Sequence, residues 1–167
     1  MKKQPDLFVW LRSQLRSISR KYPPLYQALA AAKKPYKGDN PRQKVCYECA
    51  KCQKTYAAKE VAIDHREDCG GLKSWDDVQG FMQRLFCDAD GLDVLCHNCH
   101  DIKTYMTRHS VTEQEAAISK EVIAIFKNNS KEDVIDFIKA HDYNDVYATN
   151  NEVNRKAAVK LILEKIS

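Results

Sequence analysis

Apolar residues recur at steps of three or four positions at the start of the chain, which is the spacing of one face of an α-helix. The pattern predicts an amphipathic helix over residues 6–22, starting near Pro5; its apolar positions are Leu7, Leu11, Leu15, Ile18 and Tyr22. Pro23 and Pro24 end this helix, because proline cannot continue it. A second short helix is expected over residues 25–32, followed by a basic linker over residues 33–41.

The middle of the chain alternates short apolar runs with turn residues, which favours short strands and short helices. Residues 74–77, Ser-Trp-Asp-Asp, resemble a helix-capping box with aspartate in place of the usual glutamate. The expected order is short strands within residues 45–64, clearest at 61–63, a helix over 74–86, a turn at 90–91, a strand over 92–95 and a helix over 99–109. The pattern as a whole predicts an α+β fold.

The last third of the chain predicts helices and carries no catalytic constellation. Residues 112–115, Thr-Glu-Gln-Glu, form a capping box, and Ser130 is a second N-cap. The expected helices cover residues 116–127, 131–140 and 151–166. Packing or partner contact is the expected role of this tail. A DNA-reading helix at residues 151–160, with Asn154, Arg155 and Lys156 exposed, is an alternative that the net acidity of the tail argues against.

The distribution of charge divides the chain into three segments. Residues 1–54 carry 13 Lys and Arg against 3 Asp and Glu, whereas residues 55–110 carry 6 against 10 and residues 111–167 carry 8 against 10. A basic first third favours contact with nucleic acid, although charge alone fits a soluble basic face equally well. We therefore expect a basic helical arm and linker over 1–44, a core over 45–110 and a helical C-terminal extension over 111–167.

The cysteines indicate a metal rather than disulfides. Their number is 7, an odd count, and the chain has neither a secretory apolar region after its first residues nor a membrane-length apolar run, so we expect a reducing cytoplasmic location. Two Cys-x-x-Cys pairs supply the four thiolates of a structural zinc site; they are Cys49 with Cys52 and Cys96 with Cys99. Cys46 also pairs with Cys49, and spacing alone leaves Cys46 and Cys52 as alternatives. Cys69 and Cys87 are expected to be buried thiols.

Asp64 and His65 follow the clearest strand, and His100 follows Cys99 directly. If Cys99 anchors the start of a helix, His100, Lys103 and Thr104 share one of its faces. An aspartate and a histidine make an incomplete ligand shell, with room for waters and a phosphate oxygen, which suits Mg²⁺ or Mn²⁺ in a hydrolytic site. A neutral imidazole at His65 can accept a proton from an attacking water.

The stretches CAKCQKTYAAKEVAIDH (49–65) and LCHNCHDIKT (95–104) resemble the zinc-containing branch of the HNH, or ββα-metal, endonucleases. The segment at 73–77 and the N-terminal segment around residues 11–24 look like a bacteriophage-type subgroup. The resemblance is specific from about residue 46 to 104, weaker over 7–36 and absent beyond about 112. It implies a ββα-metal core with a four-cysteine zinc site, flanked by basic N-terminal helices and a helical tail, and it favours Cys49 and Cys52 over Cys46.

The resemblance also implies roles for single residues. Asp64 resembles the first ligand of the catalytic ion, His65 the general base and His100 the last histidine of the motif, a second ligand of that ion. Gly91 stands where the family has an asparagine, which leaves open whether Asp90, Asp93 or the backbone at Gly91 orients His65. Candidate phosphate contacts are Arg66 and Lys103, together with the N-terminal stripe of Arg12, Arg16 and Arg20, whose alternative reading is a solvated helix face.

The resulting expectation is a metal-dependent HNH endonuclease that hydrolyses DNA phosphodiester bonds, phage-encoded, of a homing or packaging-associated type. It would use structural Zn²⁺ and catalytic Mg²⁺ or Mn²⁺ in the host cytoplasm. Its expected partner is DNA, with a phage packaging protein or a second copy of the chain as candidates for the C-terminal helices. The alternative is a non-catalytic, zinc-stabilised module that binds nucleic acid or protein.

Overall fold

Helices and two small antiparallel sheets build this α+β chain, which divides into two units, residues 1–100 and residues 101–167. The computed structural model describes residues 6–141 and 151–166, so Pro5 lies outside the described part. The predicted arm and most of the predicted core fall in the first unit, and the predicted C-terminal extension falls in the second. Within the described residues, every helix is too short or too polar to cross a membrane.

Helix α1 (Leu7–Ser19) starts at Asp6, whose carboxylate accepts the backbone N–H of Phe8 at 2.8 Å. Its packed face differs from the predicted one: Leu7 and Ile18 are 51% and 61% exposed. The packed face includes Phe8 instead, which packs against the same cluster as Leu11 and Leu15. That cluster is completed by Cys69, Leu72, Val78, Phe81, Leu85 and Phe86.

Helix α2 (Pro23–Ala31) begins with the two prolines, where the missing N–H groups would have had no helical partner. The prolines therefore start α2, whereas α1 already ends at Ser19, earlier than the predicted end at residue 22. Residues predicted as a linker form strand β1 (Lys33–Pro35) instead. It pairs antiparallel with β2 (Val45–Glu48), which pairs with β3 (Thr55–Tyr56). The linker prediction, residues 33–41, was wrong for residues 33–35, because their backbone groups find hydrogen-bond partners in β2 that the basic, proline-containing sequence does not indicate.

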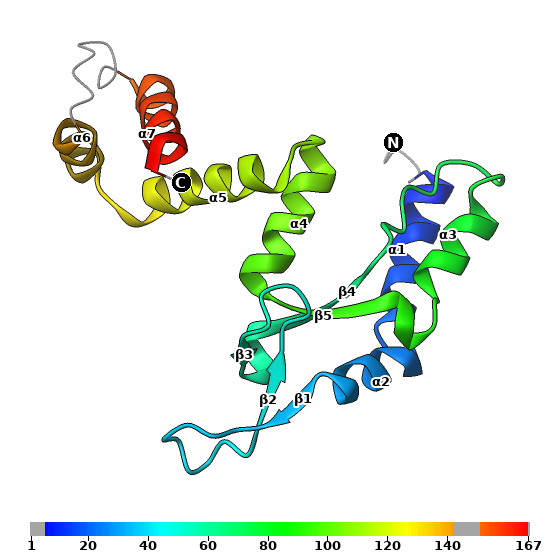
Figure 1. The fold of residues 1–167 in the computed structure, drawn as a ribbon. Helices are drawn as coiled ribbons and strands as arrows, with labels where there is room; N and C mark the ends of the chain where they lie inside the picture. Colours follow the sequence, from blue (N-terminus) through cyan, green and yellow to red (C-terminus); the bar gives the residue numbers. More distant parts are fainter. Residues whose placement is uncertain (1–5, 142–150, 167) are drawn as a thin grey trace, which may run out of the picture. The chain divides into compact units, whose positions relative to one another are not determined.

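Strands β4 (Val61–His65) and β5 (Leu92–Cys96) form the second sheet (Figure 1). Their register pairs Asp64 with Asp93 and His65 with Leu92. Helix α4 (His97–His109) follows β5 without a break, which gives the order strand, strand, helix. The short helices η1 (Ala58–Glu60) and η2 (Ala89–Gly91) precede the two strands, and α3 (Val78–Leu85) lies in the long connection between them. Helix α3 starts later than predicted, because Asp77 accepts N–H groups from residues 73 and 74 in a turn before the helix.

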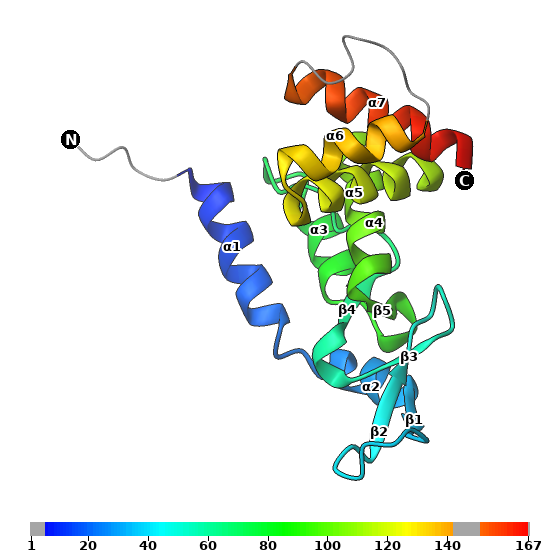
Figure 2. The ribbon, with the colours of Figure 1, turned by 90° about the vertical axis from the view of Figure 1, so that its left-hand side faces the viewer.

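The second unit contains α5 (Glu113–Asn128), α6 (Lys131–Ala140) and α7 (Glu152–Ile166), packed on one another (Figure 2). Both predicted N-caps are confirmed. The Glu115 carboxylate accepts the N–H of Thr112 at 2.9 Å, and the Asp133 carboxylate accepts the N–H of Ser130 at 2.9 Å. These reciprocal bonds satisfy N–H groups that have no partner inside the helix.

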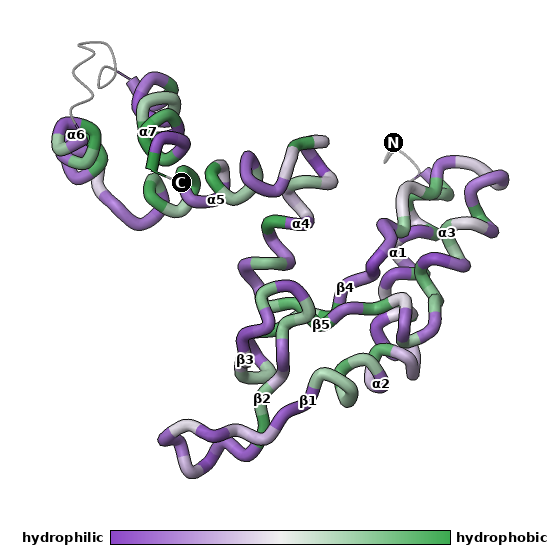
Figure 3. The backbone as a smooth tube through the Cα atoms, viewed as in Figure 1, coloured by the Kyte–Doolittle hydropathy of each residue, from purple (hydrophilic) through white to green (hydrophobic). Residues whose placement is uncertain are grey.

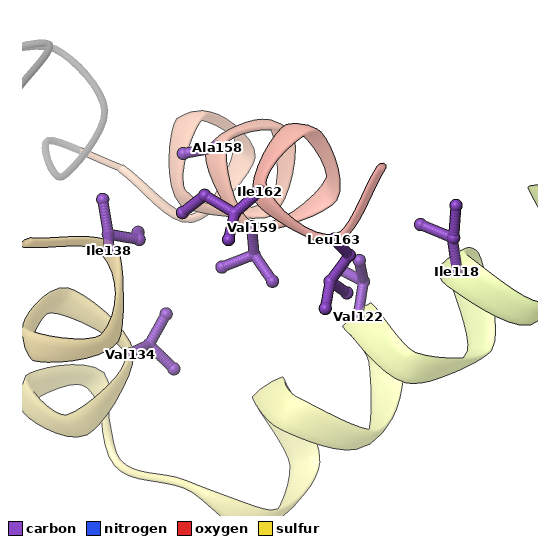
Figure 4. Packing of buried hydrophobic residues seen from close by; sticks show 8 residues of the cluster. All are labelled: Ile118, Val122, Val134, Ile138, Ala158, Val159, Ile162 and Leu163. Carbon is purple, nitrogen blue, oxygen red and sulfur yellow. The ribbon is translucent and has the colours of Figure 1, made fainter. Parts of the chain in front are cut away.

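Apolar side chains from all three helices point toward one another in the core of the second unit (Figure 4). They are Ile118, Val122, Val134, Ile138, Ala158, Val159, Ile162 and Leu163. Arg155 is 8% exposed beside this core, which argues further against the alternative of a DNA-reading helix with Arg155 exposed. The hydropathy tube shows that polar residues dominate the β1–β2 connection and that apolar ones recur along α5 and α7 (Figure 3).

Candidate metal centre and hydrolytic site

A tight turn after β2 carries the first cysteine pair. Cys49 donates its backbone N–H to the carbonyl of Lys54 at 2.9 Å, and Gln53 donates its N–H to the carbonyl of Cys49 at 2.9 Å. Gln53 takes a left-handed conformation, with φ of 59°, to close this turn. The bonds bring Cys49 and Cys52 onto the same side of one loop.

The second pair lies where a strand becomes a helix. Cys96 is the last residue of β5, and Cys99 lies in the first turn of α4. The N–H of Cys99 points at the Sγ atom of Cys96 at 3.5 Å. N–H groups at a helix start have no partner inside the helix and carry partial positive charge, so this position suits a thiolate.

The fold brings both pairs together. The sulfur atoms of Cys49, Cys52, Cys96 and Cys99 all lie within 4.8 Å of one another. A tetrahedral zinc ion with Zn–S bonds of about 2.3 Å separates its sulfur ligands by about 3.8 Å, so small side-chain movements would complete such a site. Three of the four cysteines are buried and Cys49 is 0% exposed, which suits thiolates whose charge a metal neutralises. The donor set, four thiolates without carboxylates, fits zinc.

Tyr56 on β3 supports this cluster from outside it. Its hydroxyl lies 3.4 Å from the sulfur of Cys52, and the hydrogen bond lowers the pKa of that thiol to about 6, while it raises the pKa of Tyr56. Burial acts to raise the pKa of Cys96, but the Cys99 N–H and the Tyr56 hydroxyl outweigh it and the pKa falls. Burial and the neighbouring thiols raise the pKa of Cys99. Two of the thiols are therefore prepared to lose their protons, as zinc ligands must.

The remaining cysteines lie elsewhere. The Cys46 sulfur lies 3.6 Å from the carbonyl oxygens of both Lys34 and Pro35, so β1 holds it away from the cluster. The alternative in which Cys46 replaces Cys52 is therefore not the arrangement of this fold. Cys69 is buried, as predicted, whereas Cys87 is only half-buried; burial raises the pKa of both thiols.

Asp64 and His65 are the last two residues of β4, and both are half-buried. The Nε2 atom of His65 lies 3.0 Å from the carbonyl oxygen of Leu85, the last residue of α3. A carbonyl at a helix C-terminus has no partner inside the helix, so the imidazole supplies one. One contact that orients His65 thus comes from a backbone group that the sequence did not point to.

Asp93 and Gly91 both contact Arg66. The guanidinium of Arg66 binds the carboxylate of Asp93 at 2.8 Å, and its backbone N–H donates to the carbonyl of Gly91 at 2.9 Å. A Cβ atom at Gly91 would lie 2.8 Å from the sulfur of Cys87, closer than real Cβ contacts allow. Gly91 therefore stands in a place that a side chain such as asparagine cannot occupy unless Cys87 moves.

The other predicted site residues lie on helices. His100 is half-buried in the first turn of α4, and Lys103 follows one turn later in the same helix. Arg12, Arg16 and Arg20 are exposed on α1 and at its C-cap. Within the described ranges, the four cysteines form the only group of three or more Cys, His, Asp or Glu side chains close enough to hold a metal, so a catalytic ion on Asp64 and His100 stays a prediction.

Two contacts escaped prediction from the sequence. Tyr56 lies four residues after Cys52, but an aromatic residue at that distance is too common to indicate a role. The Leu85 carbonyl carries no sequence signal at all.

Comparison of the chain with family models, with curated proteins and with solved structures finds no significant match.

Proposed function

We propose that this chain is a metal-dependent endonuclease of the HNH type that hydrolyses phosphodiester bonds in DNA. The order of parts in the first unit carries this proposal. Strand β4 ends in Asp64 and His65, its antiparallel partner β5 ends in a cysteine of the cluster, and α4 follows at once with His100 in its first turn. Zinc at the four-cysteine cluster would fix the junction between β5 and α4, from which His100 projects.

His65 is the proposed general base. Because a carbonyl oxygen only accepts hydrogen bonds, the contact with Leu85 requires a proton on Nε2, and the neutral ring then keeps its acceptor lone pair on Nδ1. This nitrogen would take the proton of the attacking water. The negative end of the α3 dipole faces the ring, which suits the positive charge that the ring gains with that proton.

Asp64 and His100 are the proposed ligands of a hard divalent ion. A carboxylate and a neutral imidazole fit Mg²⁺ or Mn²⁺ with further positions left for oxygen ligands. Such an ion, when bound, supplies positive charge to the phosphate oxygens and to the leaving 3′ oxygen.

Binding of DNA would rest on the exposed basic residues. Arg12, Arg16 and Arg20 provide charge to the phosphate backbone without reading sequence. Lys103 remains a candidate phosphate contact. Arg66 reaches a phosphate only if its guanidinium exchanges Asp93 for it.

A plasmid assay tests the proposal. With Mg²⁺ or Mn²⁺ the purified chain is expected to convert supercoiled plasmid into nicked or linear DNA, and Asp64→Asn is expected to lower this activity by at least a hundredfold. Removal of the divalent ion should stop cleavage, with zinc content measured in the same sample because a chelator can also extract structural zinc. Retarded migration of DNA without any cleavage would instead support the non-catalytic zinc module.

A further inference from the structure

A pocket of about 350 Å³ opens in the first unit beside the connection that follows His65. Its volume is within the range of small-molecule sites in proteins, about 300–1,000 Å³. The lining combines one carboxylate, one amide, one guanidinium and one thiol with two glycines. The lining residues are Glu67, Gly80, Gln83, Arg84, Cys87 and Gly91.

Arg84 is held in place but keeps most of its donors. Its Nε–H donates to the carbonyl of Cys69 at 3.2 Å. The guanidinium lies against two glycines, because a Cβ atom at Gly80 would meet Nη1 at 3.2 Å and one at Gly70 would meet Nη2 at 3.5 Å. In the described part of the chain, neither Nη group has a hydrogen-bond partner. Arg84 thus presents a planar, pre-oriented pair of donors.

Glu67 and Gln83 add complementary groups to the same pocket. Neither side chain makes a hydrogen bond or ion pair with another described residue. Glu67 and Arg84 both line the pocket and make no ion pair with each other, so a ligand that enters the pocket can contact both charges.

We propose that this pocket binds a guanine base of the DNA next to the cleaved phosphate and so gives the enzyme a sequence preference. A guanine that is unpaired, either in single-stranded DNA or turned out of the duplex, presents two acceptors, O6 and N7, which match the paired donors of arginine. It also presents two donors, N1–H and N2–H, which match a carboxylate. The other bases lack this combination of acceptors on one edge and two donors on the next. Gln83 can satisfy either kind of group.

The location of the pocket connects it to the proposed chemistry. Arg84 directly precedes Leu85, whose carbonyl holds His65, and Gly91 accepts the N–H of Arg66 through its carbonyl. Glu67 is two residues beyond His65 in the chain. A base bound here would lie beside the phosphate that His65 is proposed to serve. The inference rests on the proposed nuclease activity for its consequence, although not for the binding itself.

Cleavage of a random-sequence DNA library, with sequencing of the new ends, tests the consequence. The wild-type chain is expected to show guanine on the order of tenfold over the other bases at one fixed position near the cut. Arg84→Lys keeps the charge but not the paired donors, and Glu67→Gln keeps the shape but not the charge. Each should reduce the guanine ratio to less than about twofold. The ratio is internal to each sample, so a lower total rate does not disturb it.

Asp76→Asn is the matched control, because Asp76 is exposed, lies outside the pocket and loses the same charge as Glu67. It should keep the wild-type guanine ratio. An even base distribution for the wild-type chain, or an unchanged ratio in Arg84→Lys, would overturn the proposal.

Nucleotide binding separates this inference from the nuclease proposal. In an NMR titration, deoxyguanosine monophosphate should shift the amide signals of Gly80 and Gly91 at concentrations at least about tenfold below those needed for the adenine, cytosine and thymine nucleotides. Arg84→Lys should abolish that difference. This result would support the pocket even if the chain cut no DNA, and equal binding of all four nucleotides would reject the pocket even if it did.

Discussion

Two regions of this chain stay folded by different means. In the second unit, eight aliphatic side chains from α5, α6 and α7 are each at most 7% exposed and fill one core. Around the turn at 49–54 in the first unit, the buried cluster consists of Leu95 and three cysteines, with Cys52 and Tyr56 at its edge. The turn region of the first unit is built around thiols, whereas the core of the second unit is built from aliphatic side chains.

The difference indicates where a bound metal would contribute most to stability. Short strands and a tight turn bury too little apolar surface to offset the entropy lost on ordering them. A bound zinc ion can supply that stability at one point and leave the nearby surface free for polar side chains. The three residues proposed for hydrolysis, Asp64, His65 and His100, lie in the unit that contains the four-cysteine cluster. The helical unit contributes none of them.

Loss of a zinc ligand should produce the largest effect. Structural zinc contributes about 10–16 kcal/mol in small zinc-binding peptides at pH 7, as much as the total stability of an ordinary domain. Cys96→Ser should therefore release zinc and unfold the region around β2 to β5, while the second unit stays folded. Hydrogen exchange should show lost protection at residues 45–100 and retained protection in α5, α6 and α7.

Cys46→Ser is the control for this experiment, because Cys46 is also buried but contacts β1. It should keep one zinc ion per chain. Loss of zinc in Cys46→Ser, or full zinc content in Cys96→Ser, would contradict the assignment of the four ligands.

A cavity in the helical core should give the opposite pattern. Ile138 is 0% exposed, and its replacement by alanine should destabilise the second unit by about 2–5 kcal/mol. Thermal unfolding followed by circular dichroism should show this loss, with zinc content unchanged. Leu161→Ala, at a position 42% exposed, should cost much less, and a similar cost at both positions would contradict the packing described.

Removal of the Tyr56 hydroxyl should have a moderate effect confined to the metal. Tyr56→Phe keeps the ring but deletes the hydrogen bond to Cys52, so the pKa of that thiol rises toward its ordinary value of 9.0. Partners of metal ligands typically contribute about 10–100-fold in metal affinity. Competition with a chromophoric chelator should show a loss in this range. An unchanged affinity would mean that Tyr56 only packs against the cluster.

Acidification should destabilise the second unit, by a smaller amount than the substitutions above. Hydrogen bonds from the capping residues Thr112 and Ser130 lower the pKa of Glu115 and Asp133 below their ordinary values of 4.5 and 3.8. These bonds stabilise the second unit above those values and are lost as the pH falls through the lowered pKa values. Its melting temperature should fall on acidification below about pH 4.5, and the double variant Glu115→Gln, Asp133→Asn should show a flatter dependence in the same melts. An equally steep fall in the variant would exclude the caps as the cause.

Elements with local signals were predictable from the sequence. The caps at Thr112 and Ser130 involve residues three positions apart, so the pattern contains the interaction itself. The two cysteine pairs were equally readable, and the resemblance that chose Cys52 over Cys46 agrees with the cluster in the structure.

Features set by distant contacts were not predictable. β1 depends on pairing with β2 across a connection of nine residues, 36–44, and the packed face of α1 depends on where α3 lies. Arg155 reads as a surface residue until the α5–α7 core surrounds it. The contact of His65 with Leu85 joins positions 20 residues apart through a backbone atom, which no side-chain pattern can signal.

The most direct test of the proposed chemistry compares two histidines in one plasmid cleavage assay. His65 and His97 each place Nε2 against a backbone carbonyl, that of Leu85 at 3.0 Å and that of Lys59 at 2.9 Å, but only His65 is a proposed base. His65→Ala should reduce Mg²⁺- or Mn²⁺-dependent cleavage by at least a hundredfold, with zinc content and DNA affinity retained, and His97→Ala should cleave like the wild-type chain. Undiminished cleavage by His65→Ala would contradict the assignment.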